Sequence, residues 1–164
     1  MTNYNLNNLY EALSYAETGG ERNPWIRTNY QPPEGSSAFG PVQITKGLLE
    51  NAIKNKLLSD DAIKFSNDVL LPMQSNMLKY GGGDMKPGYE MYDYGGTGGF
   101  KPEEYSKEYK NLSKELIKWH IEKSEGDIDK FLTLWKSGSL DGKAPDEGYI
   151  KRFKSKYKNT HYKR

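Results

Sequence analysis

The sequence predicts a mainly α-helical protein, and three observations lead to this fold class. Apolar residues recur at spacings of three and four along several segments, which is the period of an amphipathic helix. Residues that favour helix starts, among them Thr45, Ser59 and Pro102, stand before or at the beginning of such segments. With 164 residues the chain has the length of one compact domain, so we expect a single domain over residues 1–164.

The first predicted helix is followed by a long loop. The apolar stripe of this helix consists of Leu6, Leu9, Tyr10, Leu13 and Ala16. Gly19-Gly20 is a typical helix stop. Residues 21–39 are dominated by Pro, Gly, Ser and Asn, which predicts a loop at the rim of a cleft, with a short hairpin around 26–30 and 42–44.

Two further helices are expected before residue 80. Thr45 is a suitable cap for a helix that runs to about residue 58, and Ser59-Asp60-Asp61 has the composition of the next cap. The third helix directs a set of apolar residues to the core: Ile63, Val69, Leu70, Met73 and Met77. Pro72 is expected to kink or divide this helix, because proline lacks the backbone N–H of a helical residue.

The second half of the chain begins with a glycine- and tyrosine-rich segment. Residues 80–100 contain eight glycines, and we expect a functional loop there with Tyr89, Tyr92 and Tyr94. Pro102 opens a long helix to about Lys123. Two more helices are expected near 127–137 and 146–157.

Composition argues against several classes of site. The absence of cysteine excludes disulfides and thiolate metal sites, and two histidines far apart in the chain do not favour zinc, so we expect no metal or other cofactor. No Ser-His-Asp set is suggested, and His120 is interpreted as a partly buried structural histidine. The segment 95–99 lacks the Gly-Lys-Ser/Thr ending of a phosphate-binding loop.

The charge distribution predicts a basic C-terminal helix and tail at 151–164. This segment carries seven of the 24 Lys and Arg residues and no acid, so residues 1–150 have 17 basic against 22 acidic side chains. Such a tail suits anionic wall polymers or attachment to a larger particle, and we expect no specific nucleic acid as partner. The alternative is a solvated helix end without a partner. No stretch approaches the ~20 apolar residues of a membrane span.

Glu17 has an unusual position on the first helix. It lies four residues after Leu13 and seven after Tyr10, so its carboxyl is expected to point to the same inward side as the apolar stripe. It is also in the last turn, where the helix dipole disfavours a negative charge. Both effects raise the pKa of a carboxyl group, as a general acid requires. The alternative is a Glu at a frayed helix end that rotates into solvent.

Several motifs resemble the lytic transglycosylase branch of the lysozyme-like superfamily. The first is Ala16-Glu17-Thr18-Gly19-Gly20, and it is followed by Asn23-Pro24 and by Ser37-Ala38-Phe39-Gly40-Pro41-Val42-Gln43-Ile44. Here Glu17 matches the catalytic Glu of the family, Thr18 stands where Ser is usual, and residues 40–43 match the Gly-Leu-Met-Gln signature. Leu134-Trp135-Lys136-Ser137-Gly138 is similar to the Ala-Tyr-Asn-Ala-Gly motif, and Tyr149-Ile150-Lys151-Arg152-Phe153 is similar to the closing helix.

The resemblance implies a lysozyme-like helical domain with a hairpin or loop region lining a glycan cleft, and an enzyme that degrades peptidoglycan. Glu17 would protonate the glycosidic oxygen between N-acetylmuramic acid and N-acetylglucosamine, then accept the proton of the muramoyl C6 hydroxyl to give a 1,6-anhydro end. The alternative is a hydrolytic lysozyme, for which Glu34, Glu90 and Asp93 are the candidate second carboxylates. Trp135-Lys136 replaces the family's Tyr-Asn pair, which leaves the substrate contacts there open.

The expected substrate-binding residues follow from these motifs and from the tyrosine-rich segment: Thr18, Phe39, Gly40, Val42, Gln43, Tyr94, Trp135 and Tyr149. For Trp135 core packing is the alternative role, since it shares a stripe with Phe131 and Leu134. A non-catalytic module that binds glycan or nucleic acid is the rival function. The chain begins without an export signal and has the size of one small domain, which suggests a phage enzyme, carried in the virion or delivered to the host cell wall or periplasm. A bacterial cytoplasmic or specially secreted protein is the alternative, and we expect a monomer.

Overall fold

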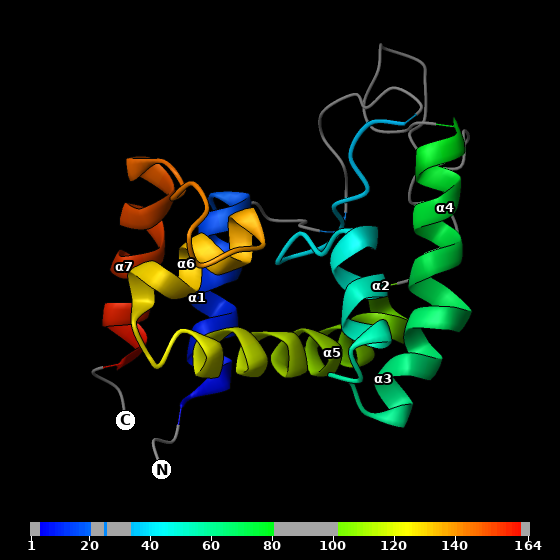
Figure 1. Cartoon of the computed structure of the whole chain (residues 1–164), viewed down its shortest axis with the longest axis horizontal. Coiled ribbons are helices and arrows are strands. Elements are labelled where there is room, and N and C mark those ends of the chain that lie inside the picture. The colour runs from blue at the N-terminus through cyan, green and yellow to red at the C-terminus, as the bar shows by residue number, and fades with distance from the viewer. Residues whose placement is uncertain (1–3, 21–24, 26–33, 81–101, 162–164) are drawn as a thin grey trace. The chain divides into compact units, whose positions relative to one another are not determined.

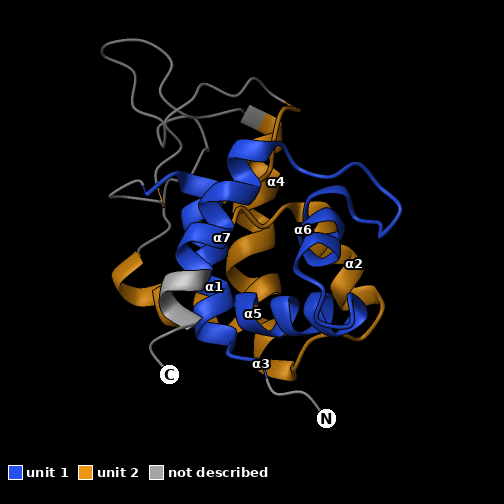
Figure 2. Ribbon diagram, turned by 90° about the vertical axis from the view of Figure 1, so that its left-hand side faces the viewer, with its two compact units in different colours: residues 1–21, 113–164 blue, residues 22–112 orange. Residues whose placement is uncertain are grey.

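The computed structural model describes residues 4–20, 25, 34–80 and 102–161 of the chain. These residues form a mainly α-helical protein, as the sequence predicts (Figure 1). The chain divides into two compact units (Figure 2). Unit 1 comprises residues 1–21 and 113–164, and unit 2 comprises residues 22–112. The expectation of one domain over the whole chain stays a prediction.

Unit 1 is built from α1 (Leu6–Thr18), the second half of α5 (Pro102–Lys123), α6 (Ile128–Ser137) and α7 (Glu147–His161). These bounds agree with the predicted helices, except that α7 continues four residues further than expected. Helices α1 and α7 lie side by side (Figure 1). The N-terminal and C-terminal parts of the chain therefore share one core.

The core of unit 1 contains the predicted stripe of α1 except Leu6, which is partly exposed. Leu9, Leu13 and Ala16 are fully buried and Tyr10 is 6% exposed. The other helices contribute further buried side chains, namely Leu116, Ile117, Ile121, Phe131, Leu132, Leu134, Trp135, Tyr149 and Phe153. Burial of so much apolar surface is the main force that holds these helices together.

Polar side chains define where the helices of unit 1 begin. The side chain of Asn5 accepts a hydrogen bond from the backbone N–H of Asn8 at 3.0 Å. Asp127 accepts from the N–H of Lys130 at 3.0 Å in the same way. Such caps satisfy backbone donors that have no partner within the helix, and replacing one by Ala typically costs about 1 kcal/mol.

Unit 2 contains α2 (Lys46–Lys54), α3 (Asp60–Phe65), the π-helical turn η1 (Ser66–Leu70), α4 (Leu71–Tyr80) and the first half of α5. The predicted caps are confirmed: Thr45 accepts from the N–H of Leu48 at 3.1 Å, and Ser59 accepts from the N–H of Ala62 at 3.2 Å. Both are helix-starting positions that a Ser or Thr side chain favours.

Helix α2 ends four residues earlier than predicted. Lys56 adopts a φ of 58°, and its N–H donates to the carbonyl of Ile53 at 3.1 Å. The N–H of Leu57 reaches back to the carbonyl of Ala52 at 3.0 Å. This pair of bonds is a Schellman C-cap, which usually has glycine at the left-handed position. Because a lysine occupies it here, the sequence carried no stop signal.

The predicted effect of Pro72 is confirmed. Pro72 is the second residue of α4 and cannot donate a backbone hydrogen bond to the preceding turn. The π-helical turn η1 lies directly before it and separates α3 from α4. The hydrogen bonding of the helix is thus rearranged around the missing donor.

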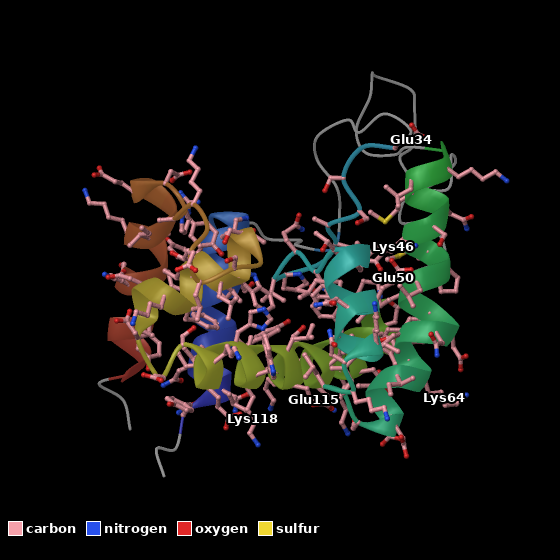
Figure 3. All side chains as sticks on the ribbon, viewed as in Figure 1. Glu34, Lys46, Glu50, Lys64, Glu115 and Lys118 are labelled. Atoms are coloured by element: carbon pink, nitrogen blue, oxygen red, sulfur yellow. The ribbon has the colours of Figure 1, made fainter. Side chains whose placement is uncertain are left out.

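A hairpin was expected around residues 26–30 and 42–44, and within the described residues the structure has only an isolated β-bridge there. Phe39 and Ile44 pair in antiparallel fashion, with N–H to carbonyl distances of 3.0 and 3.1 Å. The other expected segment, 26–30, lies outside the described residues. The bridge leads directly into α2, on whose surface Lys46 and Glu50 form an ion pair of 2.9 Å (Figure 3).

Within residues 4–80 and 102–161, apart from the gaps given above, no helix is long and apolar enough to cross a bilayer.

Candidate active site

Glu17 lies in the last turn of α1, and its side chain is only 6% exposed. The inward orientation expected from the apolar stripe is therefore confirmed, and the solvent-facing alternative is not what the structure shows. Directly after it, Gly19 adopts a φ of 65°, and its N–H donates to the carbonyl of Tyr15 at 2.8 Å. This left-handed cap at Gly19 ends the helix at Thr18 and keeps Glu17 in its last turn.

Tyr149 on α7 is the closest partner of Glu17. Its hydroxyl donates a hydrogen bond of 2.6 Å to Oε2 of Glu17. Tyr149 is itself 5% exposed. Burial, followed by the neighbouring charge and hydrogen bond of Glu17, raises the pKa of this phenol, so Tyr149 keeps its proton and remains a donor.

Lys136 on α6 contacts the same carboxyl group from another direction. Its Nζ lies 3.2 Å from Oε1 and 3.3 Å from Oε2 of Glu17. The ammonium group also lies 5.0 Å from the centroid of the Tyr149 ring, in the range of a cation–π contact. Three helices thus bring an acid, a phenol and an ammonium group into mutual contact.

Arg152 on α7 supplies a second positive charge near the end of α1. Its Nε and Nη2 donate to the carbonyl of Ala16 at 3.1 and 2.8 Å. The guanidinium thereby satisfies a carbonyl in the last turn of α1, which has no partner within the helix. It also lies 6.0 Å from the centroid of the Tyr149 ring.

The pKa of Glu17 is raised above its ordinary value, because burial disfavours the charged form. The charge of Lys136, the hydrogen bonds from Tyr149 and Lys136, and the charge of Arg152 all act in the opposite direction, but together they do not cancel the effect of burial. The carboxyl group therefore retains its proton to higher pH than an exposed Glu. This is the property that a general acid needs.

No family model matched the sequence, and the searches among curated proteins and solved structures gave no match either.

The other predicted site residues of unit 1 have structural contacts. The hydroxyl of Thr18 donates to the carbonyl of Ser14 at 2.8 Å. Trp135 is 8% exposed, and its ring lies 4.9 Å from that of His120 in an edge-on arrangement. Trp135 is thus part of the core of unit 1, as the alternative interpretation had it. His120 is 3% exposed and hydrogen bonds through Nδ1 to the carbonyl of Leu116 at 2.7 Å.

The predicted substrate-binding residues of unit 2 come together in one turn. Phe39 and Val42 are 1% and 0% exposed, so their side chains pack in the core. Tyr109 holds the turn closed: its hydroxyl donates to the carbonyl of Phe39 at 2.7 Å and accepts from the N–H of Val42 at 3.2 Å. At Gly40, whose φ is 82°, a Cβ atom would lie 2.5 Å from Cζ of Tyr109. Only glycine fits there.

Gln43 occupies the last position of the turn with a φ of 55°, a conformation that non-glycine residues rarely adopt. Its side-chain Nε2 donates to the carbonyl of Gly40 at 2.9 Å, which stabilises the turn. The side chain is partly exposed. Strained backbone of this kind costs about 1 kcal/mol or more and is frequent at functional sites.

A buried amide on α4 supports the same turn. Gln74 is fully buried, and its Nε2 donates to the carbonyls of Ser37 and Ile44 at 3.2 and 3.0 Å. Local sequence patterns do not reveal the roles of Gln74, Tyr109 and Lys136, because these roles depend on contacts between residues that are 30 or more positions apart.

The remaining predicted residues are Glu34, Glu90, Asp93 and Tyr94. Glu34 is exposed in unit 2, and Tyr94, Glu90 and Asp93 lie outside the described residues. Among the side chains that the structure describes, no group of three or more His, Asp or Glu residues has the arrangement of a metal site.

Proposed function

We propose that this protein is a peptidoglycan lytic transglycosylase that cleaves the bond between N-acetylmuramic acid and N-acetylglucosamine, with Glu17 as its acid and base. The observation that carries this proposal is the buried carboxyl of Glu17 at the end of α1, which has a raised pKa and a 2.6 Å hydrogen bond from Tyr149. The motif resemblance assigns the catalytic role to the same residue. A lysozyme-like fold with a glycan cleft belongs to this proposal.

The reaction needs one carboxyl group that first gives and then takes a proton. Protonated Glu17 donates its proton to the glycosidic oxygen as the C1–O bond of the muramoyl residue breaks. The C6 hydroxyl of the same sugar then attacks C1 and loses its proton to the Glu17 carboxylate. A 1,6-anhydro bond replaces the glycosidic bond, no water is consumed, and Glu17 regains its starting state.

The neighbours of Glu17 suit both halves of this cycle. Burial favours the protonated form that the first step consumes. The Tyr149 hydroxyl stabilises the carboxylate that the second step requires, since a hydrogen bond to a charged acceptor is roughly twice as strong as a neutral one. The phenol remains protonated throughout because its own pKa is raised.

The motif resemblance assigns substrate contacts to the turn of residues 39–44 in unit 2. Gln43 offers an amide whose oxygen can accept a hydrogen bond from an N-acetyl group of the glycan. Gly40 allows close approach of the backbone, because it has no side chain. The buried side chains of Phe39 and Val42 support the turn from within the core.

The decisive experiment is mass spectrometry of the soluble fragments that purified peptidoglycan releases. The wild type is expected to give fragments that end in 1,6-anhydromuramic acid, and Glu17→Gln is expected to lower their release by about 10²–10⁴-fold. Glu11→Gln is the matched control, because Glu11 is an exposed residue of the same helix. Reducing ends would show a hydrolytic lysozyme instead, and no release by the wild type would favour a non-catalytic binding module.

A further inference from the structure

Lys136 stands at the position where the resembling motif has Asn, and this departure places a positive charge against the proposed catalytic carboxyl. The ammonium lies within 3.3 Å of both oxygens of Glu17. The two side chains differ in their access to solvent: Lys136 is 39% exposed, whereas Glu17 is 6% exposed. The lysine therefore covers the buried acid from the solvent side, as the outermost member of the cluster.

We propose that Lys136 is a positioning residue for Glu17, which orients its carboxyl group and sets the pH range over which Glu17 can act as an acid. This inference rests on the proposed acid and base role of Glu17. Lys136 is not expected to exchange a proton with the substrate itself.

The geometry supports an orienting role because two donors hold the carboxyl group from different helices. Tyr149 binds Oε2 from α7, and Lys136 binds both oxygens from α6. Two hydrogen bonds from different helices fix the orientation of the carboxyl plane. A fixed orientation defines the direction in which Glu17 can transfer its proton. Asn would offer an uncharged donor on a much shorter side chain.

The charge of Lys136 is the second part of the argument. Among the residues that the structure describes, the ionisable groups that act on Glu17 are Lys136 from α6 and Tyr149 and Arg152 from α7. Among the effects that oppose burial, the charge of Lys136 is the largest. The positive charge of Lys136 stabilises the carboxylate and thereby limits the increase in the pKa of Glu17 that burial causes. Too high a pKa would weaken the base that the second step needs.

The test is a comparison of Lys136→Met, Lys136→Arg and Lys130→Met by two measurements. Met keeps most of the apolar stem of lysine and removes the charge, and Arg keeps the charge. Lys130 is an exposed residue of the same helix and serves as the control for a lost charge. The first measurement is a carbon NMR titration of the Glu17 carboxyl, assigned by comparison with Glu17→Gln. The second is the pH profile of glycan release.

Lys136→Met is expected to move the titration of Glu17 to higher pH, to shift the alkaline limb of the activity profile in the same direction, and to lower the maximal rate. Lys136→Arg and Lys130→Met are expected to keep the wild-type titration. An unchanged titration and an unchanged limb in folded Lys136→Met would overturn the proposal. Absence of glycan release by the wild type would overturn the function of Glu17 instead, and the titration would still decide whether Lys136 controls its charge.

Discussion

The hydroxyl of Tyr149 and the carboxyl of Glu17 lie 2.6 Å apart, although 132 positions separate the two residues in the chain. The contact joins the end of α1 to the first turn of α7, and both side chains are almost completely buried. A buried donor and acceptor that satisfy each other are costly to separate. This pair is the structural centre of the candidate site.

Tyr149→Phe is expected to lower glycan release and to raise the pKa of Glu17, because the carboxylate loses a hydrogen bond that stabilises it. The unfolding free energy is expected to fall by about 1–3 kcal/mol, the usual cost of a buried polar group that loses its partner. Urea unfolding and fragment analysis measure the two effects. Tyr15→Phe, at an exposed position of α1, should change neither. Full activity of Tyr149→Phe would contradict a role for the hydroxyl.

Glu17 should make the stability of the protein depend on pH. The pKa of Glu17 is higher in the folded than in the unfolded state. At pH values near the ordinary pKa of Glu, the folded protein therefore binds more protons at this residue than the unfolded chain does. The contribution of Glu17 is therefore most favourable at low pH and is lost as the pH rises through the folded pKa. Glu17→Gln should gain stability relative to wild type as the pH rises above the ordinary pKa of Glu, about 4.3, measured by urea unfolding. A constant difference across this range would argue against the raised pKa.

His120 should also make the stability of the protein depend on pH, but its contribution should be lost in acid. Burial lowers the pKa of His120 to about 4, although its bond to the Leu116 carbonyl acts against this shift. The folded state thus favours the neutral ring. The resulting stability is present above the unfolded pKa of about 6.5 and is lost as the pH falls toward 4, by about 3 kcal/mol in total. His120→Phe should lack this dependence in acid unfolding experiments. An equal acid sensitivity in the variant would refute the assignment.

Gly40→Ala is expected to destabilise unit 2. The new Cβ would meet the ring of Tyr109, which is fully buried and hydrogen bonded at both ends of the turn. Overpacking and the positive φ together should cost roughly 2–5 kcal/mol. Gly47→Ala is the control: it lies in α2 with nothing within 4 Å of the added Cβ, and should stabilise by about 0.5–1 kcal/mol. Similar unfolding midpoints for the two variants would contradict this packing argument.

Local signals in the sequence predicted most of the helices correctly. Caps such as Thr45, Ser59 and Asp127 act on backbone groups three residues away, so they can be recognised from the sequence alone. The burial of Glu17 was predictable for the same reason, because the helical period places it on the stripe of α1. The end of α2 was missed, since Lys56 adopts the left-handed conformation without being glycine.

The partners of the site could not be predicted in this way. The contact between Lys136 and Glu17 depends on how α6 packs against the end of α1, and helical periodicity carries no information on that packing. The two hydrogen bonds that the Tyr109 hydroxyl makes to the turn of residues 39–44 likewise depend on the packing of distant segments. Whether Trp135 binds sugar or fills the core was also open, and its 8% exposure supports the core role.

The two hydrogen bonds from Arg152 to the Ala16 carbonyl have a consequence for how the protein is made. Residues of α1 leave the ribosome before those of α7, because they come earlier in the chain. Glu17 therefore cannot acquire its buried environment until α7 has been synthesised, and contacts of such long sequence separation form late in folding. In a nascent chain that stops before α7, Glu17 would lack Tyr149 and Arg152 as neighbours, so the buried acid would form only once α7 is present.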